Sequence, residues 1–221
     1  MSSDPKLIPY VLPLIDGCRI LDVACGKGKW GYLINVDFRY TAAGRPLKKQ
    51  QLEFLVGVDI FLPYLRFVKK YGLYDDVVLC DALHLPFRAQ AFDVTLAAEM
   101  LEHLQKRHGF TLLKEIERVS KKSAIITTPR HPTGILSQGT KDKNIFQRHI
   151  SKWSARELEA LGYVVIGRSF PFENLLDIAS SLFPRLTGIF PQTPFCFIAK
   201  KRLDTKHVMH SNILQKEEGI S

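Results

Sequence analysis

Residues 20–31 read ILDVACGKGKWG, and this stretch decides the fold class that the sequence predicts. An apolar pair is followed by Asp22, and a loop then carries Gly26, Gly28 and Gly31. The pattern is typical of a buried strand that turns sharply into a helix, because glycine tolerates positive φ and lets a ligand approach the backbone. The Gly-x-Gly-x-x-Gly spacing also fits a dinucleotide fingerprint, so the glycines alone do not identify the ligand. The acidic residues around the loop are needed to distinguish the candidates.

Outward from this loop, apolar runs alternate with segments of helical spacing. The alternation predicts an α/β fold with a parallel sheet covered by helices on both faces. A short apolar segment, 6–16, is expected to pack on this sheet. The expected strands are 19–23, 54–58, 77–80, 92–97, 123–128, 163–166 and 195–199, and the expected helices are 28–36, 63–71, 104–121 and 154–161.

The length of 221 residues favours one domain, which we place at 1–203. Two segments interrupt its pattern: a basic insertion near 37–52 and an apolar insertion near 170–192. The polar residues 204–221 are expected to form a flexible tail.

The composition indicates which classes of partner the protein could bind and in which compartment it is expected. A net charge of +9 favours anionic partners such as nucleic acid or acidic lipid headgroups, although it also fits a merely basic solvated surface. The four cysteines form no C-x-x-C pair, so their spacing does not indicate zinc or a redox dithiol. The start resembles no signal peptide, and no apolar run reaches the roughly 18 residues of a membrane span. We therefore expect a cytoplasmic protein without a transmembrane segment.

Acidic residues fall at or just beyond the carboxyl ends of four expected strands, where parallel sheets bind their ligands. They are Asp22, Asp59, Asp81 and Glu99. A nicotinamide fingerprint places its ribose-binding acid roughly 20 residues after the glycines, and it does not explain Asp22. A phosphate-binding P-loop requires Ser or Thr after the lysine, whereas Trp30 follows Lys29 here.

A ligand with a positive charge, a ribose and an adenine explains the acids better. Asp22 could face an ammonium or a sulfonium, and Asp59 could accept both ribose hydroxyl protons. Asp81 could accept from the adenine amino group, while the backbone N–H of Ala82 meets a ring nitrogen. These properties together describe S-adenosylmethionine.

Four motifs in order resemble the class I S-adenosylmethionine-dependent methyltransferases, in particular the methyltransferase type 11 and ubiquinone-pathway O-methyltransferase group. The motifs are residues 22–28, 57–59, 80–87 and 92–94, within a resemblance that covers about 19–130. The resemblance implies a Rossmann-like, seven-stranded, mostly parallel sheet that ends in an antiparallel hairpin. The cofactor-binding residues it implies are Asp22, Ala24, Gly26, Gly28, Asp59, Ile60, Asp81, Ala82 and Leu83.

The acceptor side is predicted from Glu99, Glu102 and His103, which share one face at helical spacing. Two acids and an imidazole could serve as a general base, or they could bind a divalent metal. The E-x-x-E-H pattern resembles that of the ubiquinone-pathway O-methyltransferases and the small-RNA 2′-O-methyltransferases, which implies such a metal. In the RNA enzymes a later histidine joins the set, and His149 has a similar place. The alternative is that these residues only shape the pocket and cap the helix.

The acceptor itself stays open between two readings. The basic residues of 39–49 favour a nucleic acid, as in an RNA 2′-O-methyltransferase with a divalent metal. The apolar segment 170–190 favours a small or lipid-like acceptor, or contact with a membrane surface or a partner, and we lean slightly to the small or lipid-like acceptor. Two other classes are kept as alternatives: an NAD-binding dehydrogenase-like protein and a non-catalytic Rossmann binding module.

Overall fold

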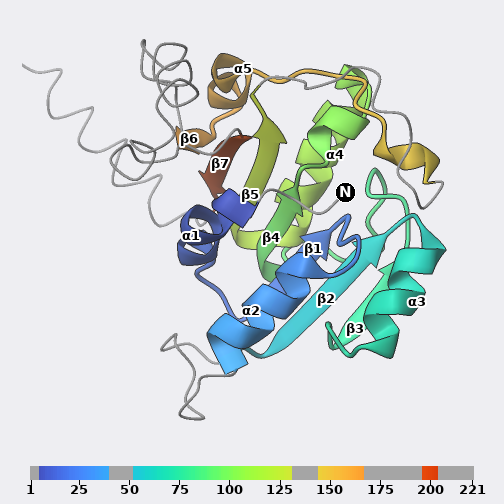
Figure 1. The fold of residues 1–221 in the computed structure, drawn as a ribbon. Coiled ribbons are helices and arrows are strands. Elements are labelled where there is room, and N and C mark those ends of the chain that lie inside the picture. Colours follow the sequence, from blue (N-terminus) through green and yellow to red (C-terminus); the bar gives the residue numbers. More distant parts are fainter. Residues whose placement is uncertain (1–4, 40–51, 131–143, 167–195, 204–221) are drawn as a thin grey trace, which may run out of the picture.

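A seven-stranded sheet forms the centre of the molecule (Figure 1). The computed structural model describes residues 5–39, 52–130, 144–166 and 196–203. The strand order is β3-β2-β1-β4-β5-β7-β6, and the first five strands along this order are parallel. β7 runs antiparallel to both β5 and β6. The predicted mostly parallel sheet with an antiparallel C-terminal pair is confirmed.

The strands lie close to their predicted positions, because strands covered on both faces are continuous apolar runs. β5 begins three residues earlier than predicted, directly after the preceding helix. The bounds are β1 Arg19–Val23, β2 Phe54–Asp59, β3 Asp76–Leu79, β4 Phe92–Ala98, β5 Ser120–Pro129, β6 Val164–Ile166 and β7 Cys196–Arg202.

The helices connect the strands on both sides of the sheet. In α5 the Ser154 hydroxyl and the Glu157 carboxylate form the predicted capping box. The helix bounds are α1 Ile8–Val11, α2 Lys29–Arg39, α3 Leu62–Lys70, α4 Lys106–Val119 and α5 Ala155–Ala160, and short 3-10 turns lie at Pro5–Leu7, Leu12–Leu14, Leu101–His103 and Ile145–Gln147.

Two hydrophobic clusters show which helices cover which face. Val11 of α1, Ile34 of α2 and Leu65 of α3 belong to one cluster. Leu112 of α4 and Leu158 of α5 belong to the other. The prediction of helices on both faces is therefore confirmed.

One boundary prediction was wrong. Residues 37–39, assigned to the basic insertion, continue α2, whose buried Phe38 adds to its apolar face. The remainder of that insertion, the apolar segment 170–192 and the tail 204–221 lie outside the described residues, so the division into domain, insertions and tail stays a prediction. Among the helices that the structure describes, each is too short or too polar to cross a membrane.

Candidate functional site

The glycine loop follows β1 and has the backbone conformation that its sequence predicts. Ala24, Gly26 and Gly28 all have positive φ, at 58°, 54° and 79°. A Cβ on Gly28 would lie 2.6 Å from Leu73 Cδ1, so the close approach of this loop to the start of β3 requires glycine. The backbone N–H of Cys25 donates to Val58 O at 2.9 Å, which fixes the loop to the end of β2.

Asp59, at the end of β2, joins the glycine loop to the next strand. One carboxylate oxygen accepts from the Gly26 N–H at 2.9 Å, and the other accepts from the Phe61 N–H at 2.8 Å. Burial raises the pKa of Asp59, and these backbone hydrogen bonds oppose that rise. The carboxylate therefore lies directly beside the loop, at the position from which the predicted ribose contact would be made. Ile60 follows it and is 43% exposed.

Asp22 lies behind the glycine loop rather than facing its open side. Its side chain is 1% exposed, and Oδ2 accepts a 2.5 Å hydrogen bond from the Tyr74 hydroxyl. That hydroxyl in turn accepts from the Gly31 N–H at 3.1 Å. Burial raises the pKa of Asp22 to about 7. The expectation that Asp22 directly faces an ammonium or a sulfonium is therefore corrected: Asp22 holds Tyr74, and Tyr74 holds the start of α2.

The residues predicted to bind the adenine lie within 80–87, on the loop after β3, which we call the adenine loop. The Asp81 carboxylate is exposed and accepts from the Leu83 N–H at 2.9 Å, whereas Ala82 is buried. Two residues of α4 hold the loop from behind. Glu115 accepts from the Leu85 N–H at 2.9 Å, and the Arg118 guanidinium donates to Leu85 O at 3.0 Å and to Phe87 O at 2.7 Å.

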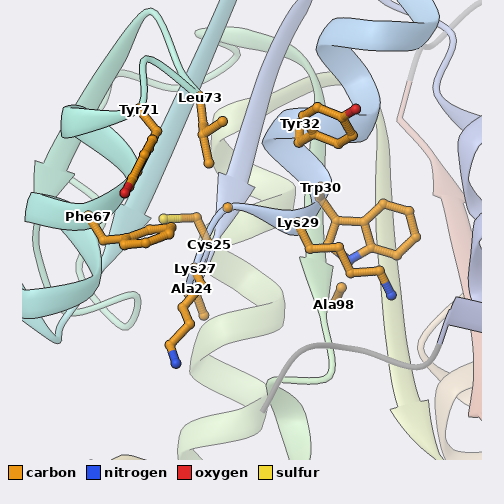
Figure 2. A pocket seen from close by; sticks show the side chains of 12 residues that line it. Ala24, Cys25, Lys27, Lys29, Trp30, Tyr32, Phe67, Tyr71, Leu73 and Ala98 are labelled. Carbon is orange, nitrogen blue, oxygen red and sulfur yellow. The ribbon is translucent and has the colours of Figure 1, made fainter. Parts of the chain in front are cut away.

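A pocket of about 510 Å³ opens at the glycine loop, a volume within the usual range for small-ligand sites. Figure 2 shows Phe67 of α3 and Tyr71, which directly follows α3, on one side of the loop and Trp30 on the other. The charged side chains that line it are Lys27 and Lys29. Its lining residues are Ala24, Cys25, Gly26, Lys27, Gly28, Lys29, Trp30, Tyr32, Phe67, Tyr71, Leu73 and Ala98.

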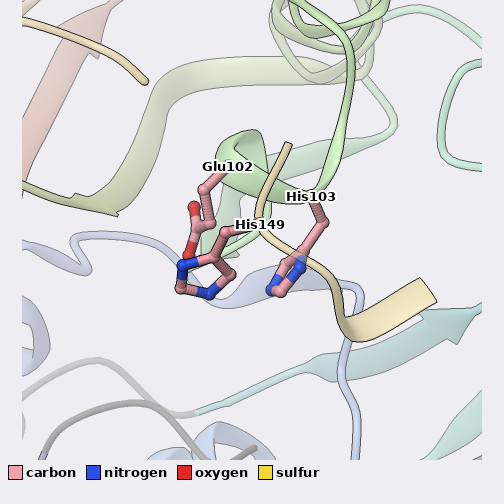
Figure 3. Close-up of side chains that lie close together, drawn as sticks. All are labelled: Glu102, His103 and His149. Carbon is pink, nitrogen blue, oxygen red and sulfur yellow. The ribbon is translucent and has the colours of Figure 1, made fainter. Parts of the chain in front are cut away.

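Three of the four predicted acceptor-side residues come together beyond the end of β4. Glu102, His103 and His149 each offer a ligand atom, and these atoms lie within 4.8 Å of one another. The two imidazole rings meet edge to face at a centroid distance of 4.8 Å. Figure 3 shows the three side chains turned toward a common space. We call Glu102, His103 and His149 the acceptor-side triad.

Contacts across about 50 residues of sequence build this triad. The Glu102 carbonyl accepts from the Ile150 N–H at 2.7 Å and from the Ser151 N–H at 3.1 Å. The Leu101 carbonyl accepts from the Ser151 hydroxyl at 3.0 Å and from the Trp153 indole at 3.4 Å. The segment that carries His149 is thereby fixed against the 3-10 turn that carries Glu102 and His103.

The surroundings set the protonation states of the triad. Burial raises the pKa of Glu102 to about 8, with the nearby Glu99 charge adding to the shift. Burial lowers the pKa of His103 to about 4, so this imidazole is neutral at physiological pH. His103 Nδ1 lies 3.1 Å from Arg148 O, which can only accept, so the proton is assigned to Nδ1 and Nε2 keeps its lone pair. His149 Nδ1 is buried and has no partner among the described residues.

Glu99 is oriented differently from its prediction. It lies before the 3-10 turn with φ of 52°, so the helical spacing that placed it on one face with Glu102 and His103 does not apply. Its N–H donates to Thr127, and its carboxylate accepts from Cys196 Sγ at 3.3 Å, across the sheet edge. In the described part of the chain, Glu99 is therefore not one of the clustered ligand atoms, and its place in a metal set is corrected.

Sequence reasoning missed Tyr74, Glu115 and Arg118. Tyr74 stands in a short polar turn before β3, and no local pattern indicates that it reaches a carboxylate 52 residues away. Glu115 and Arg118 have the i,i+3 spacing of an ion pair on a helix surface, which is a readable signal. That signal does not reveal that the pair also binds the adenine loop.

The comparisons with known proteins agree with this geometry. The fold and the glycine loop define a Rossmann-like methyltransferase domain, and the methyltransferase domain family matches residues 21–128. A solved S-adenosylmethionine dependent methyltransferase from Mesorhizobium loti superposes with a TM-score of 0.58 at 14% identity, over 89% of this chain and 97% of that one. Residues 21–128 therefore belong to the methyltransferase domain family, and the fold is that of the S-adenosylmethionine-dependent methyltransferases.

The names of two curated relatives state different acceptors. A tRNA (carboxymethyluridine(34)-5-O)-methyltransferase from Arabidopsis thaliana is 23% identical over 67% of this chain and 33% of its own length. An ajmaline N-methyltransferase from Rauvolfia serpentina is 26% identical over 74% of this chain and 51% of its own length. The chain spans between 22% and 51% of the length of the curated relatives it matches.

Proposed function

We propose that this chain transfers a methyl group from S-adenosylmethionine to an acceptor held near the acceptor-side triad. The observation that carries the proposal is the position of Asp59, whose carboxylate holds Gly26 of the loop at the mouth of the pocket. Asp81 and the buried Ala82 follow at the neighbouring strand end, where an adenine would lie. The triad lies beyond β4 along the same carboxyl edge.

The chemistry asks little of the protein beyond alignment. The acceptor attacks the methyl carbon, the carbon–sulfur bond breaks, and the sulfonium becomes a neutral thioether. The positively charged donor is already activated, so orientation of the two reactants supplies most of the acceleration. An oxygen acceptor must also lose its proton, and when no cation holds the free Nε2 of His103 this nitrogen can accept it, with Glu102 beside it. Glu99 stays a third acceptor-side candidate.

The triad also suits a divalent cation, which we propose as part of this site. One carboxylate and two imidazoles are ligands that Mn²⁺ or Zn²⁺ accepts, and the carbonyl that orients His103 is the usual outer partner of a metal-binding histidine. His149 Nδ1 is buried and without a partner in the described ranges, which fits a site for a cation. A bound cation would stabilise the negative charge that develops on an acceptor oxygen.

Apolar side chains beside the triad support a small or lipid-like acceptor. Ile145, Phe146 and Ile150 are 75%, 45% and 54% exposed, on the segment that carries His149. A hydrophobic acceptor would cover such side chains, and so would a membrane surface. The predicted contact through 170–190 lies outside the described residues. A cytoplasmic location likewise stays an expectation.

An RNA acceptor is the second candidate, and two observations favour it. The net charge of +9 suits a polyanion. One curated relative is named for methylation of tRNA. In this alternative the triad and its cation would act on a ribose 2′-hydroxyl. The match to the methyltransferase domain family argues against the dehydrogenase-like alternative. A non-catalytic module would bind the donor without turnover.

A labelled-donor assay tests the proposed activity. Purified protein and methyl-labelled S-adenosylmethionine are incubated with separate pools of small RNA, lipid and small-molecule extract. We expect label in the lipid or small-molecule pool, and at subsaturating donor concentration the transfer should fall in Asp59→Asn. Label in RNA alone would favour the second candidate. Donor binding without label in any pool would contradict the enzymatic activity.

Titration with Mn²⁺ by calorimetry tests the metal independently of activity. We expect binding of one ion to the wild type, and a loss of at least about tenfold in affinity for Glu102→Gln and for His149→Ala, because each removes a ligand. His84→Ala, an exposed histidine outside the triad, is the matched control and should bind as the wild type does. Equal binding by all four proteins would contradict a metal at the triad.

A further inference from the structure

Trp30 carries a buried hydrogen-bond donor that has no partner in the part of the chain that the structure describes. Its side chain is 4% exposed, and its indole N–H has no partner among the described residues. Trp153 shows the usual arrangement, since its buried indole N–H donates to Leu101 O at 3.4 Å. Buried polar groups are nearly always paired in native proteins, and an exception calls for an explanation such as a ligand.

The surroundings of this N–H select for a negative charge. Trp30 lines the pocket at the glycine loop, and Figure 2 shows its indole beside Lys29 and near Ala98 at the end of β4. Lys29 Nζ lies 5.5 Å from the centre of the Trp30 ring, and Lys27 lines the same pocket. The 11-residue helix α2 begins at Lys29, so its positive end also points here. Among the described residues that line the pocket, none is acidic.

We propose that the Trp30 indole N–H donates a hydrogen bond to the carboxylate of the methionine part of S-adenosylmethionine. This inference rests on the proposed function. The carboxylate is the anionic group of that donor, and an indole N–H can only donate, so it cannot bind the ammonium. Lys27 and Lys29 would repel the ammonium and the sulfonium, and they favour the carboxylate on this side of the loop.

The assignment places different parts of the same donor molecule on different sides of the glycine loop. The amino-acid end of the donor lies on the Trp30 side, while the ribose lies toward Asp59 and the adenine toward Asp81. Trp30 is then a donor-binding residue that distinguishes ligands with a methionine or homocysteine carboxylate from those without one. Hydrogen bonds to charged groups contribute more binding free energy than bonds between neutral groups. Removing the Trp30 N–H should therefore cause a measurable loss of affinity for the donor.

Substitution Trp30→Phe tests this by keeping a buried aromatic ring and removing the N–H. Calorimetry compares S-adenosylhomocysteine with 5′-methylthioadenosine, which lacks the amino-acid end. We expect the affinity for S-adenosylhomocysteine to fall by about tenfold or more and that for methylthioadenosine to stay within about twofold. An equal loss for both ligands, or no loss for S-adenosylhomocysteine, would overturn the inference.

A second measurement uses the wild type and does not depend on how the variant folds. Nitrogen-15 labelled protein gives two indole N–H signals, because the chain has two tryptophans. S-adenosylhomocysteine should move the Trp30 signal downfield and slow its exchange, while methylthioadenosine leaves it in place and the Trp153 signal stays constant. Binding of S-adenosylhomocysteine with an unmoved Trp30 signal would sink this inference alone. No binding of S-adenosylhomocysteine at all would contradict the proposed function as well.

Discussion

Asp22 stands at the centre of a buried network that supports the glycine loop. Its carboxylate accepts from Tyr74, and the ring of Tyr74 fills the space where a side chain on Gly31 or Gly57 would otherwise lie. A 2.5 Å hydrogen bond to a buried, partly charged acceptor is stronger than an exposed one. The acid before the glycines therefore acts on the donor through the position of the loop.

The raised pKa of Asp22 gives a pH dependence of stability with a definite sign. Burial moves this pKa from 3.8 to about 7, so the folded protein holds the proton more tightly than the unfolded chain does. The resulting stabilisation is fully present below about pH 4 and is lost as the pH rises to about 7, by roughly 4 kcal/mol at most.

Denaturant unfolding of the wild type and of Asp22→Asn between pH 4 and pH 8 measures this effect. The variant has no carboxyl group to titrate, while its amide oxygen can still accept from Tyr74. We expect the wild type to lose stability relative to Asp22→Asn over this range. A difference between the two proteins that does not change with pH would contradict the assignment.

At the scale of elements, α4 supports both halves of the site. Its Glu115 and Arg118 bind the adenine loop, and its first turns pack against Trp153, which fixes the segment of His149. Lys106 lies over the Trp153 ring at 3.9 Å and also pairs with Glu157 of α5. One helix therefore links the donor side to the acceptor side, and changes on its two ends should separate the two functions.

Arg118→Lys should weaken donor binding without touching the donor. The lysine keeps the charge but loses the planar fork whose two terminal nitrogens donate separately to Phe87 O and Leu85 O, so the adenine loop loses part of its support. We expect about a three- to tenfold loss of S-adenosylhomocysteine affinity, equivalent to roughly 1 kcal/mol. Arg107→Lys, at an exposed position of the same helix, is the control. A lower melting temperature with unchanged affinity would mean that Arg118 only stabilises the fold.

Gly109→Ala should disturb the acceptor side. A Cβ at this position would collide with the Trp153 ring, which is buried and has little room to move. Alanine is favoured over glycine in a helix by about 1 kcal/mol, whereas overpacking a core costs about 1–3 kcal/mol, so we expect a net loss of stability. Mn²⁺ affinity should fall as well, because Trp153 anchors the segment of His149. A variant with wild-type melting temperature and Mn²⁺ binding would contradict this coupling.

The whole fold could be predicted because its signals are local and repeated. Most buried strands are short apolar runs, the glycines of the loop after β1 mark a turn, and the Ser154–Glu157 capping box is readable from four residues. The position of the expected donor site could also be predicted from the sequence, since the carboxyl ends of parallel strands meet at one edge of a sheet. Gly26 and Asp59 are joined as that rule predicts.

The acceptor side and the supporting contacts could not be predicted with the same success. Glu99 was placed by helical spacing, but its positive φ ends that regularity one residue after β4. Tyr74 contacts Asp22 only because the sheet brings distant segments together, whereas the resemblance to a known family already placed His149 with Glu102. Such contacts depend on tertiary packing, which no local pattern in one sequence specifies.

The measurement that tests the central claim most directly is calorimetric titration of the purified protein with S-adenosylhomocysteine and, separately, with NAD. We expect one S-adenosylhomocysteine bound per chain and no measurable NAD binding. The affinity of Asp59→Asn for S-adenosylhomocysteine should fall by about tenfold or more through the lost charged hydrogen bonds. Binding of NAD without binding of S-adenosylhomocysteine, or an affinity unchanged by Asp59→Asn, would contradict the donor site described for this chain.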